Sequence, residues 1–161
     1  MGPVTYRVFG PQTIIVDDAE HRLTQRRERT LLGLLVAGHG QAISAGRLIE
    51  ELWEGEPPPS ASTSIQVAIS RIRRITDADR ATRTRATHLV SIADGYAIRA
   101  ASDEVDVWQF EADVQAAIAA APQDCVSRSD VALDRWRARP TPTVPTPSGY
   151  EARSSGSANS D

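Results

Sequence analysis

The sequence predicts an α+β fold, in which a small N-terminal antiparallel sheet, three helices and a C-terminal β-hairpin precede a short helical segment. Three observations lead to this fold class. β-Branched and apolar residues alternate with polar ones over residues 4–24, helical apolar patterns fill 25–75, and an Asp-Gly pair separates two apolar runs within 88–99. Strands this short form a stable sheet only when they pack on other elements. We therefore expect one shared core.

The first 24 residues predict three short strands. Val4, Tyr6 and Val8 alternate with less apolar residues, and a Gly-Pro pair then makes a turn. Residues 13–16 are β-branched and apolar, which is typical of a second strand. We expect residues 17–20 to form the next turn and residues 21–23 the third strand.

Two helices follow. The first is predicted over residues 25–37, with Thr24 as its N-cap and glycines at 38 and 40 ending it. The second is predicted over 45–53, with Ser44 as its N-cap and Leu48 on its apolar side. Three consecutive prolines at 57–59 prevent this helix from continuing.

The third helix is predicted over residues 60–75, beginning at Ser60 or Ser62. At about 100° per residue, one face is aliphatic and comprises Ala61, Ile65, Ala68, Ile69 and Ile72. The opposite face and its flanks carry Thr63, Ser64, Gln66, Val67, Ser70, Arg71 and Arg74, with Arg73 nearer the rim. Because no acid occurs over 58–76, the free face is cationic and able to form hydrogen bonds.

The remaining residues predict a hairpin and weaker helices. We expect Gly95 to supply the positive φ of the turn between residues 88 and 99. A helix is predicted over 106–121, with an apolar stripe of Val107, Phe110, Val114, Ala117, Ile118 and Ala121. A weaker helix carrying Val131, Leu133 and Trp136 reaches about residue 138, and the Pro- and Ser-rich residues 140–161 are expected to be disordered.

Composition excludes several kinds of active site. All 18 basic residues are arginine, so a Schiff-base lysine and a P-loop lysine are excluded. The single cysteine, Cys125, excludes an internal disulfide and a multi-cysteine metal site. His21, His39 and His88 have no metal-ligand spacing, and no serine has a base paired with it in sequence. We expect no cofactor, no metal and no enzymatic activity.

The N-terminus lacks the pattern of a secretion signal, and no apolar run approaches the roughly 20 residues that span a bilayer. We therefore expect a soluble, cytoplasmic protein with no membrane partner. Charge is unevenly distributed along the chain. Residues 58–99 carry seven arginines and three aspartates, a net of +4, whereas residues 100–134 carry eight acids and one arginine, a net of −7. The basic segment has the local charge that nucleic-acid binding requires.

The order of elements is that of a winged helix-turn-helix. The helices at 44–53 and 60–75 would form the helix-turn-helix and residues 88–99 the wing. The third helix suits the major groove, because Arg pairs with guanine, Gln with adenine, and Val contacts the thymine methyl group. The alternative is an ordinary solvated helix face. The preceding sheet and the following hairpin favour double-stranded DNA as the partner.

Several spaced motifs resemble the OmpR/PhoB-type DNA-binding domain, in the version found in the Streptomyces antibiotic regulatory protein family. The motifs are Arg29-Thr-Leu-Leu-Gly-Leu-Leu-Val, Ser44-Ala-Gly-Arg-Leu-Ile-Glu-Glu-Leu-Trp53, Pro58-Pro-Ser-Ala, Ile65-Gln-Val-Ala-Ile-Ser-Arg-Ile-Arg-Arg74 and Gly95-Tyr96. The segment Asp103-Glu-Val-Asp-Val-Trp-Gln-Phe110 is similar to the junction with that family's helical, TPR-like activation domain. The resemblance implies a DNA-binding domain over 1–100, a truncated activation domain over 103–138 and a tail over 139–161.

The resemblance also implies a function and its residues. Family members bind direct repeats near a promoter in tandem, as homodimers on DNA, and contact RNA polymerase to activate transcription, as for secondary-metabolite gene clusters. The residues implied to contact bases or phosphates are Thr63, Ser64, Gln66, Val67, Ser70, Arg71, Arg73, Arg74 and Arg99, with Ser64 and Arg73 assigned to the backbone. Trp53 and Tyr96 match core positions of the family. No receiver-domain pattern precedes residue 4, so we expect no phosphorylation control within this chain, although the domain is of the phosphorelay effector type.

Two departures from the family leave a second function open. Ile92 and Ala97 stand where the family often has arginine, and Asp94 adds a carboxylate to the wing turn. The helical module is also shorter than in the family. The alternative function is an interaction module that pairs with full-length relatives without binding DNA.

Overall fold

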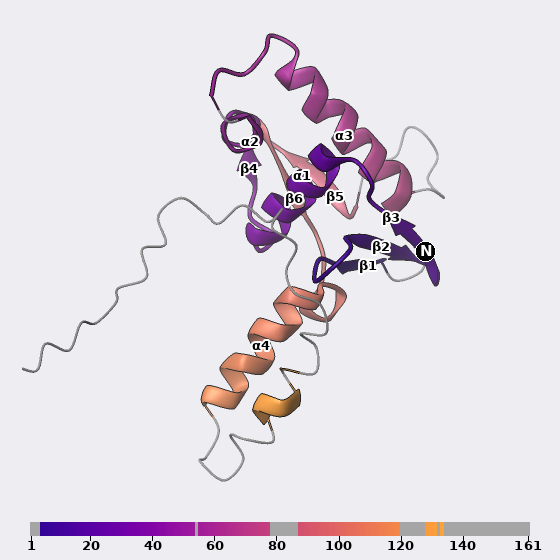
Figure 1. Ribbon diagram of the computed structural model, residues 1–161, viewed down its shortest axis with the longest axis vertical. Helices are drawn as coiled ribbons and strands as arrows, with labels where there is room; N and C mark the ends of the chain where they lie inside the picture. Colours follow the sequence, from indigo (N-terminus) through magenta and orange to yellow (C-terminus); the bar gives the residue numbers. More distant parts are fainter. Residues whose placement is uncertain (1–3, 54, 78–86, 120–127, 132, 134–161) are drawn as a thin grey trace, which may run out of the picture.

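The computed structural model describes residues 4–53, 55–77, 87–119, 128–131 and 133, and it confirms the α+β class (Figure 1). The elements in chain order are β1 (Val4–Arg7), β2 (Thr13–Val16), β3 (Ala19–Arg22), α1 (Arg26–Ala37), β4 (Ile43–Ser44), α2 (Ala45–Leu52), α3 (Ala61–Thr76), β5 (Leu89–Ile92), β6 (Gly95–Ile98), the 3-10 helix η1 (Ser102–Glu104) and α4 (Asp106–Ile118). Among the described residues, a cluster of mostly aliphatic side chains from the sheets and from α1 to α4, with Tyr6 and Trp108, forms the core.

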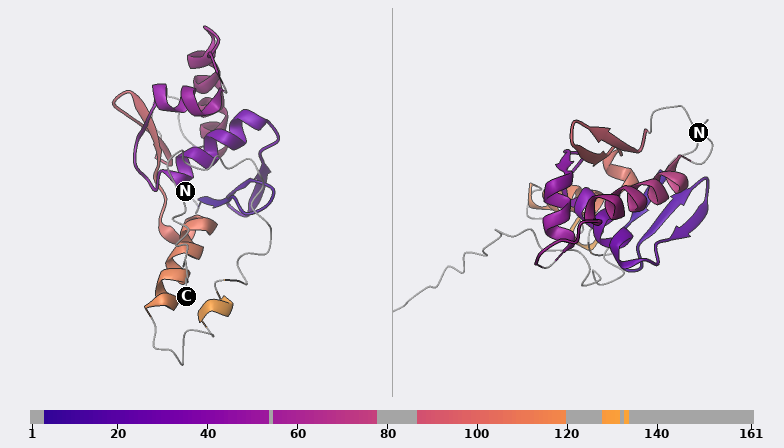
Figure 2. Two further views of the ribbon diagram at one scale, coloured as in Figure 1. Left: turned by 60° about the vertical axis from the view of Figure 1, so that its left-hand side comes forward. Right: turned by 90° about the horizontal axis from the view of Figure 1, so that it is seen from above.

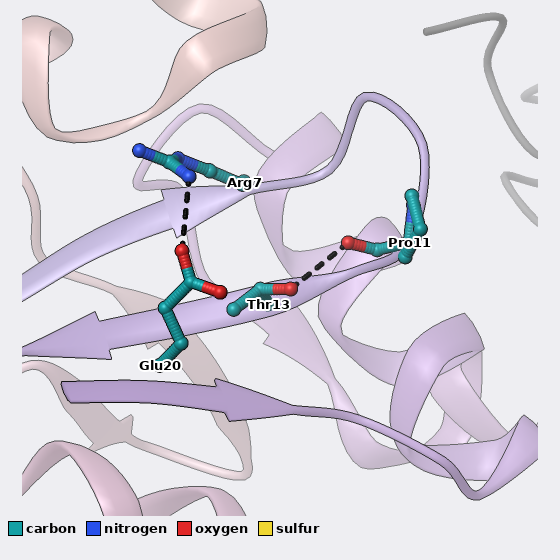
Figure 3. A network of polar contacts seen from close by, with 4 residues as sticks. All are labelled: Arg7, Pro11, Thr13 and Glu20. Atoms are coloured by element: carbon teal, nitrogen blue, oxygen red, sulfur yellow. Dashed lines mark hydrogen bonds and ion pairs between the residues drawn. The ribbon is translucent and has the colours of Figure 1, made fainter.

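The N-terminal sheet has the order β1-β2-β3, with both pairs antiparallel. The expected turn over residues 17–20 is wrong, because Ala19 and Glu20 already pair with β2. Asp17 and Asp18 alone make the turn, at φ values of 48° and 64°, which aspartate tolerates better than most residues. On the outer face, Arg7 of β1 reaches across the middle strand to Glu20 of β3 at 3.2 Å (Figure 3).

The start of α1 differs from the prediction. Thr24 is not the N-cap: Gln25 occupies that position and makes no side-chain cap hydrogen bond. The Leu23 amide, just before the predicted N-cap, donates to the Gln12 carbonyl next to β2 at 2.9 Å. The Thr24 carbonyl instead accepts from the Arg29 guanidinium at 2.6 Å.

The start of α2 is as predicted, and a strand that was not predicted precedes it. The Ser44 hydroxyl accepts from the Arg47 amide at 3.2 Å, so Ser44 is the N-cap. The predicted last residue, Trp53, is the C-cap. Ile43 and Ser44 form β4, which pairs with β6. The second sheet therefore has three strands in the order β4-β6-β5, rather than the two of a hairpin.

Gly95 is required for a different reason from the one predicted. The residue with positive φ in the wing turn is Ala93, at 51°, whereas Gly95 already belongs to β6. Gly95 is buried between β5 and β4, and a Cβ there would overlap the Ile43 carbonyl and lie 3.1 Å from the Ser44 Cα. Glycine thus permits the close approach of β4 to β6.

The beginning of α4 packs into the core of the winged helix. Val105 and Trp108 are buried, and the Trp108 indole donates to the Val36 carbonyl at the end of α1 at 2.8 Å. The Asp106 carboxylate accepts from the Val8 and Phe9 amides at 2.9–3.0 Å. Val105 also forms a parallel bridge with Tyr6 of β1. Residues 105–108 therefore complete the N-terminal sheet.

The far end of α4 extends away from this core (Figure 2). The predicted apolar stripe is only partly buried: Ala117 is buried, but 70% of Ile118 is exposed. The helix ends at Ile118 rather than 121, with Ala119 as its C-cap. Residues 128–131 and 133 are helical, with Val131 and Leu133 exposed. The predictions for Ala121, Trp136 and 139–161 lie outside the described residues.

Candidate nucleic-acid interface

The exposed face of α3 is the candidate interface. Its aliphatic face is buried as predicted, against α1, α2, β2 and β5. The opposite face is solvent-exposed along the length of the helix, and Figure 1 shows α3 at the outside of the fold. The residues on this face are Thr63, Gln66, Val67, Ser70, Arg71 and Arg74. With 46% of its surface exposed, Val67 is a large apolar side chain among polar neighbours.

The flanking residues have different surroundings. Ser64 and Arg73 are half-buried at the edges of the face. Arg99 is exposed but follows β6, and its amide donates to the His88 carbonyl at 2.7 Å. Because β5 and β6 join at Ala93 and Asp94, this bond lies at the opposite end of the hairpin from the wing turn. The structure thus brings the α3 residues together and places Arg99 at the base of the wing.

Arg73 connects α3 to the wing. Its Nε donates to the Leu89 carbonyl at 2.8 Å, and its Nη2 donates to the Ser91 hydroxyl at 2.9 Å. The guanidinium carbon also lies 5.8 Å from the centre of the Tyr96 ring, within cation–π range. Arg73 therefore holds the hairpin against the helix, a role that its sequence position did not indicate.

Arg71 pairs with an acid that the sequence analysis did not single out. Its Nη1 lies 3.1 Å from Oε1 of Glu28, in the first turn of α1. The Glu28 side chain is 10% exposed and that of Arg71 is 43% exposed. Since Glu28 is the sole acid in the arginine-rich run of residues 25–29, that isolated negative charge was the available signal. A groove of about 240 Å³ lies beside the pair, between α1 and α3.

The wing carries no exposed arginine between β5 and the end of β6. Ile92 is half-buried, whereas Ala93 and Asp94 are exposed. Ala97 is fully buried, so an arginine at that position would point into the core. The expectation that Ala97 marks a lost surface cation is therefore wrong. The Asp94 carbonyl accepts from the Ala45 amide at 3.0 Å, which ties the wing turn to the start of α2.

One buried polar group and one cation–π contact belong to the framework. Burial, reinforced by the negative charges of Asp77 and Glu104, raises the pKa of the Tyr6 phenol. Trp53 is half-buried against the core, and the Arg27 guanidinium lies 5.0 Å from its ring centre. Among the described residues, no three His, Cys, Asp or Glu side chains are grouped so as to hold a metal. No helix in the described ranges is both long and apolar enough to cross a membrane.

Residues 19–92 match the family described as transcriptional regulatory protein, C terminal. The chain is 30% identical over 151 residues to the regulatory protein AfsR of Streptomyces coelicolor. This alignment covers 91% of this chain and 14% of AfsR. It is 28% identical over 140 residues to the transcriptional regulator RedD of the same organism, covering 84% of this chain and 40% of RedD. It is also 27% identical over 142 residues to the transcriptional regulatory protein MoaR1 of Mycobacterium tuberculosis, covering 84% of this chain and 45% of MoaR1.

Among solved structures, Mycobacterium tuberculosis EmbR in complex with a low-affinity phosphopeptide superposes with a TM-score of 0.72. The sequences are 24% identical, and the match covers 86% of this chain and 37% of EmbR. This likeness shows a common winged-helix fold. The chain spans less than half the length of each of these relatives.

Proposed function

Because the chain belongs to the Streptomyces antibiotic regulatory protein family and carries its OmpR/PhoB-type DNA-binding domain, we propose that it regulates transcription by inserting α3 into the major groove of a specific DNA site. Proteins of this family are transcriptional regulators, and DNA is the partner of their winged helix. The resemblance to this family implies that α3 is the reading element.

The exposed face of α3 is the observation that carries this proposal. It combines arginine, amide, hydroxyl and one apolar side chain over 16 residues that contain no acid. Arginine and glutamine can each make two hydrogen bonds to one base edge, and Val67 is exposed enough to contact a thymine methyl group. A surface selected only for solubility would usually include acids as well.

The residues divide into four groups by their surroundings. Gln66, Val67, Ser70, Arg71 and Arg74 are exposed along the face, and we assign them to bases or adjacent phosphates. Thr63 and Ser64 lie near the N-terminal end of α3, where hydroxyls and helix amides suit phosphate oxygens. Arg99 at the base of the wing is assigned to the phosphate backbone. Arg73 contributes to binding through its hold on the wing.

The proposal also covers the mode of DNA binding, the mechanism of activation and the target genes. We infer binding as tandem homodimers to direct repeats near a promoter, activation through contact with RNA polymerase, and a target among secondary-metabolite genes. The division into 1–100, 103–138 and 139–161 accompanies it, with residues 105–108 acting as a structural joint. The acidic residues 100–134 are repelled by DNA and suit a basic protein surface, which supports a protein partner for this part of the chain.

A second candidate function rests on the wing. Asp94 is exposed at the turn, and its carboxylate would repel phosphates in the minor groove. This observation favours the interaction module that pairs with longer relatives and does not bind DNA itself.

Selection from a random-sequence duplex library separates the two functions. If the proposal holds, the full chain enriches one sequence motif, and gel-shift titrations show affinity that falls with salt by about 0.9 log units per log unit for each phosphate contact. Specific sites typically bind about 10³-fold or more tightly than random DNA. No enrichment, together with equal binding of all duplexes, would contradict the proposal and favour the interaction module.

A further inference from the structure

The ion pair between Glu28 and Arg71 places a carboxylate at the edge of the surface assigned to DNA. Glu28 is largely buried at the N-terminal turn of α1, and its Oε1 accepts from Arg71 Nη1 at 3.1 Å. The two residues are 43 positions apart in sequence, so the bond depends on the packing of α1 against α3. A negative charge near a polyanion generally opposes binding, so the position of Glu28 at the edge of this surface requires an explanation.

The bond occupies one part of the Arg71 guanidinium and leaves the rest available. Arginine has five N–H donors in a planar fork, and within the described residues Arg71 donates to Glu28 alone. Its side chain is 43% exposed, and the printed bond to Glu28 uses Nη1 and leaves the Nε and Nη2 donors uncommitted within the described residues. Two N–H groups on one edge of the fork are what a guanine base requires.

The carboxylate also affects which part of DNA Arg71 prefers. A phosphate contact depends on net charge, and the Arg71 guanidinium and the Glu28 carboxylate, 3.1 Å apart, together carry no net charge. Contacts with guanine O6 and N7 depend on directed N–H donors, which the ion pair preserves. The pair therefore weakens sequence-independent binding by Arg71 and retains base recognition.

The groove beside the pair makes this restraint necessary. It provides about 240 Å³ of open space bordered by Arg27, Ser64 and Val67, so an unrestrained Arg71 side chain has room to adopt other rotamers. Holding a long side chain in place before binding reduces the entropy lost when the complex forms.

We propose that Glu28 is a specificity-determining positioning residue: it does not contact DNA, but it holds Arg71 so that its free N–H groups meet one base. This inference rests on the proposed function. It predicts that changes at Glu28 alter the base preference at one position of the site, which a purely structural role in α1 would not do.

The test uses the full chain and the motif enriched by the wild-type protein. The variants are Glu28→Gln, which keeps an oxygen acceptor and the volume, Glu28→Ala, and Arg71→Ala alone and combined with Glu28→Ala. Glu20→Gln is the control, because it removes the same charge from another arginine pair, at the exposed face of the N-terminal sheet. Affinities are measured on every single-base variant of the motif and on random duplexes, and each variant's melting temperature is recorded.

We expect discrimination at one base position to fall about tenfold in Glu28→Ala and less in Glu28→Gln, within the range that a bidentate arginine–guanine contact supplies. The same position should be affected in Arg71→Ala, and the double variant should lose nothing further there. Affinity for random duplexes should not fall. Glu20→Gln should leave base preference unchanged.

The outcomes distinguish failure of this inference from failure of the proposed function. A motif enriched by the wild-type chain but an unchanged base preference in Glu28→Gln and Glu28→Ala would overturn this inference alone. The absence of any enriched motif would overturn the proposed function, and this inference with it. If Glu28→Ala does not fold, Glu28→Gln decides, because it preserves the shape of the side chain and one acceptor. A uniform loss of affinity that follows a lower melting temperature would also contradict the inference.

Discussion

Arg71 and Arg73 show how strongly the surroundings of a side chain determine its role. One residue separates them in α3, which turns their side chains by about 200° around the helix axis. Arg71 pairs with one carboxylate and keeps its other donors accessible, whereas Arg73 donates to two wing residues. The sequence assigned both to DNA, Arg71 to bases or phosphates and Arg73 to the phosphate backbone, whereas packing shows that Arg73 holds the wing against α3.

The two arginines should respond differently to removal. Arg71→Ala should weaken binding to the selected site by about 1–3 kcal/mol and relax the preference at one base position. Arg73→Ala should loosen the wing, lower the melting temperature and reduce affinity for all sequences alike. Gel-shift titrations on single-base variants, with thermal melts, measure both effects. An equal loss on every duplex for Arg71→Ala would make Arg71 a phosphate contact.

Asp77, at the C-terminus of α3, makes stability depend on pH. Burial alone would raise the pKa of its carboxyl. Hydrogen bonds from the Thr87 amide and hydroxyl and the Thr76 hydroxyl, with the positive potential of His88, outweigh burial and lower that pKa below its ordinary value. A lowered folded-state pKa stabilises the protein above the unfolded-state value, and this stabilisation is lost as pH falls through the folded-state value.

Asp77→Asn should therefore be less stable than the wild type at neutral pH. The difference should shrink below about pH 4, where the wild-type carboxyl becomes protonated. Because Asp77 is only half-buried, solvent screening limits the effect to under about 1 kcal/mol. Urea unfolding between pH 3 and pH 7 measures it. A difference that grows toward low pH would show that the carboxylate is not stabilising.

At the scale of the element, patterns in neighbouring residues predicted the features that depend on neighbouring residues, such as helix bounds and helix faces. The buried and exposed faces of α3 follow from helical periodicity, and its bounds were predicted to within one residue at each end. By contrast, β4 has two residues and depends on pairing with β6, about fifty residues later. The burial of Glu28 likewise depends on a partner in another helix. Such contacts are set by tertiary packing, so the sequence predicted the surface of the site but not its ion pairs.

The pairing of β4 with β6 gives a direct test at Gly95. Gly95→Ala should destabilise the fold by about 1–3 kcal/mol, because its Cβ would overlap the Ile43 carbonyl backbone. Gly46→Ala is the matched control: no atom lies within 4 Å of its Cβ position in α2, and alanine favours helix by up to about 1 kcal/mol. Denaturant unfolding of both variants checks this. Equal stability of the two variants would mean that β4 and β6 can move apart without a loss of folding free energy.

The attachment of α4 depends on one carboxylate. Asp106→Ala should cost about 1–3 kcal/mol, because the amides of Val8 and Phe9 lose their partner in a partly buried setting. Asp103→Ala, which removes an exposed carboxylate just before α4, should change stability little. Thermal melts followed by tryptophan fluorescence report on both. If the two variants have the same melting temperature, the stability of the sheet does not depend on its attachment to α4.

At the scale of the whole molecule, positive charge gathers on α3 while the wing supplies none of its own. Under the proposed function, Ile92→Arg combined with Asp94→Gly should add about one phosphate contact and steepen the salt dependence by about 0.9 log units. Base preference in the part of the site read by α3 should not change. Gel shifts over a range of salt concentrations measure the slope. Unaltered affinity at every concentration would mean that the wing stays away from the minor groove.

The bridge between Tyr6 and Val105 has a consequence for how the chain folds during synthesis. Asp106 and Val8 are 98 residues apart, yet their contact completes the first sheet. A ribosome releases the strand at the beginning of the chain long before it releases the residues that cover that strand. Contacts so distant in sequence close late, because a long loop must be ordered first. The outer edge of β1 thus stays unpaired until the residues around Trp108 emerge from the exit tunnel.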